Sequence, residues 1–193
     1  MLWILKKIWY RVFQFVLTSV MYLLPWRQPE LLTGPGSIKK LPAFIKSKGV
    51  NNVLIVTDSV LRKLGVLDSF LAACDAAGLK GVVYDGVEPN PSIENIEEAR
   101  KLYVDNKCDG IVAFGGGSAM DCAKVAGARV VKPRQSVTQM GGTLRVLKKL
   151  PPFFAVPTTA GTVSETTIAA VVTDRATHHK YAVQDRKRPS PLL

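Results

Sequence analysis

A glycine-rich segment that leads into a predicted helix is the part of the sequence best suited to bind a phosphate group. It reads Gly-Gly-Gly-Ser at residues 115–118 and continues to Asp121 and Lys124. Glycines let the backbone turn sharply and approach a ligand closely, and a helix that begins near Ser118 offers unpaired N–H groups to an anion. The segment matches neither the GxGxxG pattern nor the P-loop. The structural alternative is a tight turn in which Ser118 and Asp121 form a pair like a capping box, and Asp121 could serve both purposes.

Hydroxyl groups and a carboxylate follow two other predicted strands. Four hydroxyl side chains lie within Pro-Thr-Thr-Ala-Gly-Thr-Val-Ser-Glu at residues 157–165, namely Thr158, Thr159, Thr162 and Ser164. They could line a polar ligand, or they could simply form turns. Asp58 comes directly after the predicted strand at residues 53–57. A carboxylate there can accept hydrogen bonds from the ribose hydroxyls of NAD and would repel the extra phosphate of NADP, or it can cap a helix.

The sequence offers no set of residues for a metal site, a catalytic base or a nucleophile. Its two histidines, His178 and His179, are neighbours in a predicted hairpin, where adjacent side chains point to opposite faces, so they cannot easily hold one ion. Asp174 and Asp185 are interpreted as turn residues. The three cysteines form no CxxC pair and leave one over, which argues against a disulfide scaffold or a zinc ribbon and favours a reducing cytosol.

Predicted strands and helices alternate along the chain and would position these segments. Compact apolar runs predict strands at residues 53–57, 81–84, 110–114, 153–156 and 168–173. Helices are expected at residues 59–77, 93–106 and 119–131, with Gly78 as the C-cap of the first. The alternation predicts an α/β fold with a mainly parallel sheet and flanking helices. Ligands of such sheets bind beyond the carboxyl ends of the strands, where the three polar segments occur.

Residues 1–30 differ in composition from the rest and form a predicted hydrophobic or amphipathic helix. Lys6, Lys7 and Arg11 lie near its start, and an uncharged stretch of 15 residues follows at positions 12–26. A spanning helix needs about 20 mainly apolar residues. No small-residue cleavage site of a signal peptide follows the apolar run. The open alternatives are a helix lying on a membrane surface, a helix packed on the protein or on a second subunit, and a true anchor.

Taken together, the motifs resemble those of the iron-containing alcohol dehydrogenases, a family related to glycerol dehydrogenase and dehydroquinate synthase. The matching segments are Gly-Pro-Gly-Ser at residues 34–37, Leu-Ile-Val-Thr-Asp at 54–58, Tyr-Asp-Gly-Val-Glu-Pro-Asn-Pro-Ser at 84–92, the stretch at 108–124 and the hydroxyl-rich segment at 157–165. They occur in the family's order and approximate spacing, over about residues 31–183. The resemblance implies a Rossmann-like dinucleotide-binding domain at residues 31–193, preceded by the helix at 1–30.

The resemblance implies an oxidoreductase that interconverts an alcohol and an aldehyde or ketone by hydride transfer with NAD. Carried over by position, Gly115, Gly116, Gly117 and Ser118 correspond to the pyrophosphate turn, and Asp58 corresponds to the residue that selects the adenosine ribose. The other family cofactor positions are Asn90, Asp121, Thr158, Thr159, Thr162, Ser164 and, near the nicotinamide ribose, Lys180. Val163 departs from the family, which usually has glycine there, and this bears on how closely that backbone approaches the cofactor.

The family's divalent metal, usually Fe²⁺, polarises the substrate oxygen as a Lewis acid and is held by one aspartate and three histidines. The resemblance places these ligands after the last strand of the nucleotide domain and in a following helical domain, which is absent from a sequence ending at Leu193. We therefore expect a cofactor-binding fragment without catalytic or metal-binding residues, inactive alone, whose full-length parent would bind Fe²⁺ and a small alcohol or aldehyde. The alternatives are a stand-alone, non-catalytic nucleotide-binding module and a glycerol-type dehydrogenase relative.

The charge balance does not require a nucleic-acid partner. The 193 residues include 26 Lys and Arg against 15 Asp and Glu, a net charge of +11. Seven basic residues and no acidic one lie between Cys122 and Ser164, so much of the excess is expected to be the local surface of a dinucleotide-binding domain. We expect a cytoplasmic protein whose partner is nicotinamide dinucleotide. Peripheral membrane contact through the N-terminal segment and homo-oligomerisation stay open.

Overall fold

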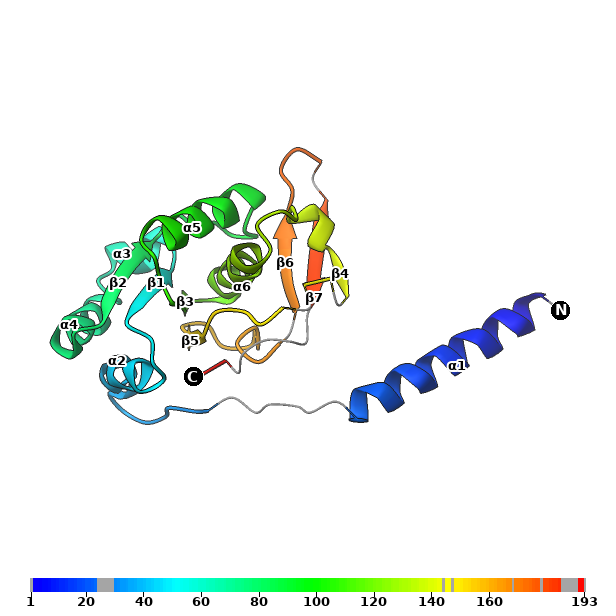
Figure 1. The fold of residues 1–193 in the computed structure, drawn as a ribbon, viewed down its shortest axis with the longest axis horizontal. Helices are drawn as coiled ribbons and strands as arrows, with labels where there is room; N and C mark the ends of the chain where they lie inside the picture. Colours follow the sequence, from blue (N-terminus) through cyan, green and yellow to red (C-terminus); the bar gives the residue numbers. More distant parts are fainter. Residues whose placement is uncertain are drawn as a thin grey trace.

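The centre of the molecule is a parallel sheet, seen in a computed structural model that describes residues 2–23, 30–143, 145–146, 148–167, 169–177, 179–184 and 191–192. Within these residues the strand order is β2-β1-β3-β5-β8, and every neighbouring pair is parallel (Figure 1). The bounds are Lys80–Tyr84 for β2, Asn52–Val56 for β1, Gly110–Gly115 for β3, Phe153–Pro157 for β5 and Pro191–Leu192 for β8. The predicted α/β fold with a mainly parallel sheet is confirmed.

Helices cover both faces of this sheet. On one face lie α5 (Ile93–Asp105) and α6 (Gly117–Val131), whose apolar side chains pack with Leu54 and Val56 of β1. On the other face lie α2 (Ser37–Ser47) and α4 (Asp68–Ala77), which pack in one cluster with Val53 and Ile55 of the same strand. The two-residue period of a strand sends alternate side chains to opposite faces, so a continuous apolar run such as β1 is buried on both.

The strand order reverses next to β1. The chain leaves β1 through α3 (Ser59–Lys63) and α4 to reach β2 on one side, and it then passes through α5 to reach β3 on the other side. Because the two connections diverge, open α/β sheets form a ligand-binding crevice at the carboxyl ends of such a strand pair. The register pairs Val56 with Ala113, so Asp58 and Gly115 follow at matching positions on this edge.

A smaller sheet lies beside α6. Its strand order is β4-β7-β6, with bounds Gly142–Thr143, Lys180–Gln184 and Ala169–Thr173, and a short 3₁₀ helix at Thr138–Met140 precedes it. β6 and β7 are antiparallel, and β6 packs against α6. The sequence predicted a strand at residues 168–173 but not its departure from the parallel sheet, and residue 168 is outside the described part of the chain.

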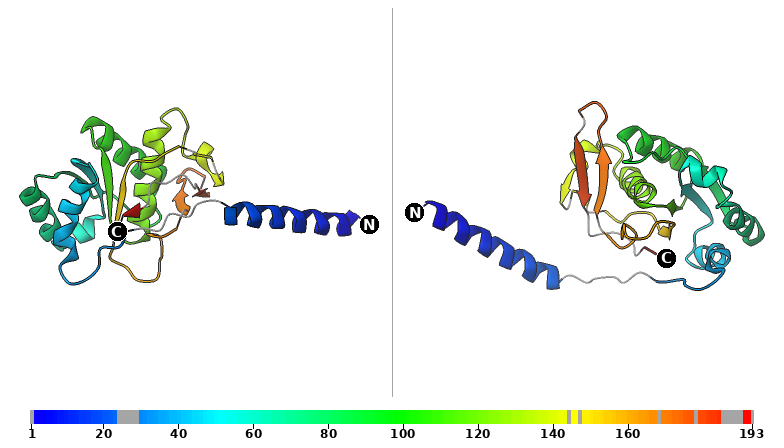
Figure 2. Two further views of the ribbon diagram at one scale, coloured as in Figure 1. Left: turned by 60° about the horizontal axis from the view of Figure 1, so that its bottom comes forward. Right: turned by 180° about the vertical axis from the view of Figure 1, so that it is seen from behind.

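α1 (Leu2–Leu23) confirms the predicted N-terminal helix and lies apart from the α/β body in every view (Figures 1 and 2). The large apolar side chains at positions 3–16 for which the structure gives an exposure are all more than half exposed. Among the described residues, the search for a helix long and apolar enough to cross a membrane finds none.

One predicted helix is divided in two. The leucine spacing predicted a continuous helix at residues 59–77, but α3 ends at Lys63 and α4 begins at Asp68. Gly65 lies between them with φ of 69°, a left-handed conformation that a right-handed helix cannot contain. Gly78, with φ of 63°, is the C-cap of α4, as predicted.

Candidate dinucleotide-binding site

The glycine segment turns the chain from β3 into α6. Gly115 ends β3 with φ of 151°, and a Cβ atom on it would lie 2.9 Å from the Cβ of Ala119. A Cβ atom on Gly116 would overlap with Thr159 Oγ1. α6 begins at Gly117, two residues earlier than predicted, and its N-cap is Gly116, which has no side chain to cap the first turn. The N–H groups of that turn lack intrahelical acceptors and mark the positive end of the helix dipole.

Asp58 lies beside this turn. Its Oδ1 accepts hydrogen bonds from the N–H groups of Val60 and Leu61, at 3.0 and 2.9 Å, and so caps α3. Its Oδ2 would lie 3.7 Å from a Cβ atom on Gly115. The capping interpretation is therefore confirmed. The two capping hydrogen bonds use Oδ1, whereas Oδ2 lies next to the glycine turn.

The loop after β5, residues 158–163, folds against the glycine turn. Thr158 N–H donates to the carbonyl oxygen of Gly115 at 3.1 Å. Thr159 Oγ1 lies against Gly116, and a Cβ atom on Gly117 would be 3.5 Å from Thr162 Cβ. The three threonines are exposed. The sheet thus brings together two polar segments that are far apart in the sequence, because β3 and β5 are neighbours with Gly115 opposite Pro157.

Val163 adopts a backbone conformation that a β-branched residue rarely adopts. Its φ is 49°, in the left-handed region, and its residue surface is 51% exposed. Glycine enters this region without a steric penalty. The structure therefore gives a physical reason for the glycine that the resemblance predicts at this position.

Three predicted site residues meet at the first turn of α6. Ser118 Oγ accepts a hydrogen bond from the N–H of Asn90 at 3.3 Å, and Lys180 Nζ donates to Asn90 Oδ1 at 3.2 Å. Asn90 has φ of 57°, a conformation that asparagine tolerates better than most residues. Ser118 lies inside the helix, so its predicted pairing with Asp121 as a capping box is wrong.

Asp121 and Ser164 bind each other within a buried network centred on Lys124. Ser164 Oγ donates to Asp121 Oδ1 at 2.7 Å, and the N–H of Val171 donates to Oδ2 at 3.0 Å. Lys124 Nζ lies 3.7 Å from Asp121 Oδ1 and donates to Ser164 Oγ and to the carbonyl oxygen of Ala169, at 3.0 and 3.1 Å. Lys124 is only 4% exposed. Lys124 was not among the predicted site residues, although its i,i+3 spacing from Asp121 is typical of a helical ion pair.

Part of the basic excess near the glycine turn is buried rather than on the surface. Arg129 is 8% exposed, forms an ion pair with Glu97 of α5 and donates to the carbonyl oxygens of Lys132 and Pro133 at 3.0 and 3.2 Å. Lys124 is buried as described above. The prediction that this stretch forms a local basic surface is therefore wrong for these two residues, whose charges are matched inside the fold.

Within the described residues, no group of three or more His, Cys, Asp or Glu side chains is placed to hold a metal ion. His179 packs its ring edge-on against Tyr181, with centroids 4.6 Å apart. Asp174 is a turn residue, as predicted: its Oδ1 accepts from the N–H of Ala176 at 2.9 Å, and a hydrogen bond from Thr177 lowers the pKa of its carboxyl group. The predictions for His178 and Asp185 fall outside the described residues.

An apolar cleft of about 260 Å³ lies on the α2 side of the sheet. Its walls include Leu31, Ile38 and Leu41, and it reaches Pro157, immediately before the threonine loop. Its lining is unlike the backbone N–H groups and hydroxyls at the glycine turn, so it is a separate feature from the polar site.

A parallel sheet between two helical layers, with a glycine turn at its switch point, defines a Rossmann-like α/β domain. Residues 28–192 match the family model described as iron-containing alcohol dehydrogenase. The chain belongs to this family, as the resemblance of its motifs predicted.

Three of the matching proteins indicate which enzymes the chain is similar to. Lactaldehyde reductase of Escherichia coli K12 is 37% identical over 153 residues, which are 79% of this chain and 40% of that protein. A crystal structure of 1,3-propanediol oxidoreductase matches with a TM-score of 0.79 and 34% identity, over 88% of this chain and 45% of that chain. Sulfoacetaldehyde reductase of Bifidobacterium kashiwanohense, solved in complex with NAD⁺, matches with a TM-score of 0.72 and 28% identity, over 88% and 46%. The chain spans about two fifths of the length of the curated relatives that it matches.

Proposed function

We propose that this chain is the cofactor-binding part of an NAD-dependent, metal-containing alcohol dehydrogenase that transfers hydride between an alcohol and an aldehyde or ketone. The observation that carries the proposal is the glycine turn at the switch point, where Gly115 and Gly116 cannot carry a Cβ atom without overlap. Family membership and the NAD⁺ complex of a structural neighbour support the same choice of ligand.

The residues present fit a dinucleotide. The bare backbone of the glycine turn lets a pyrophosphate approach the uncapped first turn of α6, whose N–H groups can donate to its oxygens. Asp58 Oδ2, next to that turn, can accept from ribose hydroxyls, and its negative charge opposes a 2′-phosphate. Thr158, Thr159 and Thr162 are exposed over the turn and can donate hydroxyl protons to the bound group.

The remaining predicted contacts divide into two roles. Lys180 and Asn90 are hydrogen-bonded to each other, and Asn90 also bonds Ser118 in the first turn of α6, so we assign the pair to the nicotinamide ribose, with the Lys180 ammonium donating. Asp121 and Ser164 are engaged with each other and with Lys124, so we assign them to positioning the loop that covers the cofactor. NAD, when bound, supplies the nicotinamide ring that accepts or donates the hydride.

The described residues do not fit the family's metal ion, because they contain no group of three ligating side chains. We therefore assign the polarisation of the substrate oxygen to groups that the described residues do not supply. We propose that this chain alone binds NAD but does not turn over alcohols. The substrate, an alcohol or aldehyde in the complete enzyme, and the homo-oligomeric state stay predictions.

Calorimetric titration of the purified chain with NAD and with NADP tests the cofactor assignment. We expect NAD to bind at least about tenfold more tightly, because the Asp58 carboxylate opposes the additional phosphate. Asp58→Asn keeps an N-cap side chain but removes the charge, so it should reduce this preference without unfolding α3. Asp75→Asn, which changes an exposed aspartate near the far end of α4, is the matched control and should leave the preference unchanged.

Two results would contradict the proposal. Equal or tighter binding of NADP to the unmodified chain would overturn the role of Asp58, and absence of binding by a folded chain would overturn the cofactor site as a whole. Turnover of small alcohols by the isolated chain with Fe²⁺ and NAD, followed by absorbance of NADH, would overturn the proposed inactivity while leaving the cofactor assignment intact.

A further inference from the structure

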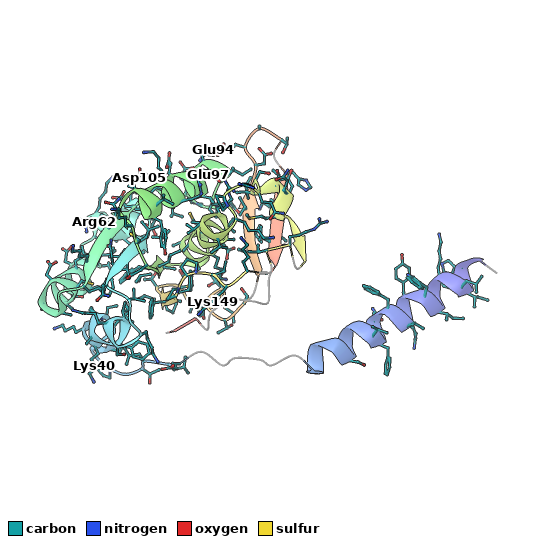
Figure 3. All side chains as sticks on the ribbon, viewed as in Figure 1. Lys40, Arg62, Glu94, Glu97, Asp105 and Lys149 are labelled. Carbon is teal, nitrogen blue, oxygen red and sulfur yellow. The ribbon has the colours of Figure 1, made fainter. Side chains whose placement is uncertain are left out.

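The helix α1 presents large apolar side chains that the α/β body does not cover. Trp3, Trp9 and Phe15 are 66%, 67% and 74% exposed, and the side chains drawn on the helix in Figure 3 extend away from it with no part of the α/β body beside them. Isolated exposed apolar residues are ordinary, but a contiguous run of them marks a surface that binds something. α1 is therefore a surface for a partner rather than part of the core of this chain.

Most of the polar side chains of α1 form one narrow stripe. Lys7, Arg11, Gln14 and Thr18 follow one another at intervals of four, three and four residues, which places them on one face of a helix. Lys6 is the one charged residue of α1 away from this stripe. Its long apolar stem allows the ammonium group to extend back toward water. Apart from Lys6 and Ser19, the remaining circumference is apolar or aromatic, as in helices that lie flat at a bilayer interface.

The charge of the N-terminal segment has one sign. Lys6, Lys7 and Arg11 are within the first half of α1, and the first acidic residue of the chain is Glu30. Lys7 Nζ lies 4.0 Å from the centroid of the Trp3 ring, which pairs a cation with an aromatic side chain at the basic end of the helix. A surface that covers this end must supply negative charge, and α1 of a second copy has none to offer.

We propose that α1 binds the surface of an anionic lipid bilayer, lying in the interface with its polar stripe toward the water. At 1.5 Å per residue, the 22 residues of α1 extend about 33 Å along the surface. The apolar side chains enter the boundary between head groups and acyl chains, and the three basic residues contact lipid phosphates and carboxylates. This surface is separate from the dinucleotide site, which lies on the α/β body.

Tryptophan fluorescence of the full chain tests this proposal directly, because all three tryptophans, Trp3, Trp9 and Trp26, lie in the first 26 residues. The chain is cleared of aggregates by centrifugation and mixed with vesicles of phosphatidylcholine alone, or of phosphatidylcholine with about 30% phosphatidylserine. We expect a blue shift of the emission and protection from acrylamide with the anionic vesicles, much weaker effects with the neutral ones, and reversal at about 0.5 M salt.

Charge variants separate the electrostatic contribution to membrane binding from the apolar contribution. The double change Lys7→Gln and Arg11→Gln should weaken partitioning onto anionic vesicles roughly 10- to 30-fold. The double change Lys39→Gln and Lys40→Gln removes the same charge from exposed positions of α2 and should have little effect. NAD binding by each variant shows that the α/β body is intact.

Three outcomes would overturn the proposal. The first is an emission spectrum that neither kind of vesicle changes. The second is equal binding to neutral and anionic vesicles that the Lys7 and Arg11 changes do not reduce. The third is a blue shift without lipid that grows with protein concentration and that vesicles leave unaltered, because this result would assign α1 to self-association.

Discussion

Val163 shows how a single residue can conflict with the backbone conformation that it adopts. Its left-handed conformation, with φ of 49°, lies in the loop that covers the glycine turn. The sequence alone showed that valine replaces the glycine usual in the family, because the rest of the hydroxyl-rich segment resembles the family motif. The sequence did not indicate that the backbone would keep the conformation suited to glycine, since that depends on how the loop packs on α6.

Replacing Val163 with glycine should therefore stabilise the protein. A non-glycine residue in the left-handed region lowers the stability of the folded state by about 1–2 kcal/mol. Glycine would remove this cost, but its greater freedom in the unfolded chain offsets roughly 0.5–1 kcal/mol of the gain in stability. We expect Val163→Gly to raise the free energy of unfolding by up to about 1 kcal/mol in urea denaturation. Val171→Gly, in strand β6 at 41% exposure, is the control and should lower it. A loss of stability in both variants would contradict the strain assigned to Val163.

The contact between Gly116 and Thr159 allows a second stability test. Gly116→Ala should lower the free energy of unfolding by roughly 1–3 kcal/mol, because the new Cβ atom overlaps with Thr159 Oγ1. Adding Thr159→Ala removes that oxygen and should recover part of the loss. Gly117→Ala is the steric control, since its Cβ atom would lie 3.5 Å from Thr162 Cβ. No recovery in the double variant would show that the loop does not lie on the turn.

The buried cysteines make stability depend on pH in the alkaline range. Burial, together with Asp109, raises the pKa of the Cys108 thiol from 9.0 to about 11, and burial with Asp75 raises that of Cys74 to about 12. The unfolded chain loses these protons near pH 9 whereas the folded chain retains them, so the unfolded state binds fewer protons above that pH. The free energy of unfolding should therefore fall as the pH rises from about 9 to 11.

Urea denaturation at several values between about pH 8 and pH 10.5 measures this slope. Cys108→Ala removes one titrating group and should make the decline shallower, whatever its effect on stability at neutral pH. Free energies that stay constant or rise over this range would contradict the raised pKa values.

At the scale of elements, apolar patterns predicted the strands well and the helix ends less well. β3 was expected at residues 110–114 and runs from Gly110 to Gly115. The prediction of one helix at 59–77 was wrong because the leucine spacing continues through the turn at Gly65. Periodicity of apolar residues alone does not reveal a positive φ. α6 begins before Ser118, with Gly116 as its N-cap, so the alternative side-chain cap by Ser118 and Asp121 does not form and the first turn stays uncapped.

Lys124 ties α6 to the smaller sheet, and its removal should cost far more than removal of an exposed lysine. Lys124→Met would leave the carboxylate of Asp121 without its buried cation, a loss of about 3–5 kcal/mol in the free energy of unfolding. Lys101→Met is the matched control, because Lys101 forms an exposed ion pair with Asp105 on α5 at 3.1 Å and should cost under about 0.5 kcal/mol. Similar small losses in the two variants, measured by urea denaturation, would show that Lys124 does not hold these elements together.

At the scale of the molecule, the sequence predicted the class of fold, the edge of the sheet where the candidate site lies and most of the segments that meet there. Strand ends followed by polar motifs were sufficient for that, because parallel strands point their carboxyl ends the same way. The sequence did not predict that Asp121 and Ser164 bind each other, nor that Lys124 and Arg129 are buried. Those facts depend on how β6 packs against α6, which no local pattern encodes.

The proposed dinucleotide site lies across the glycine turn at the switch point. Titration of the ¹⁵N-labelled chain with NAD, followed by amide chemical shifts, tests it most directly. We expect the shifts to concentrate at residues 115–118 and 158–162 and around Asp58, Asn90 and Lys180, while amides of α1 and α4 stay unchanged. Shifts centred on the apolar cleft beside α2, or none at saturating NAD in a folded chain, would contradict it.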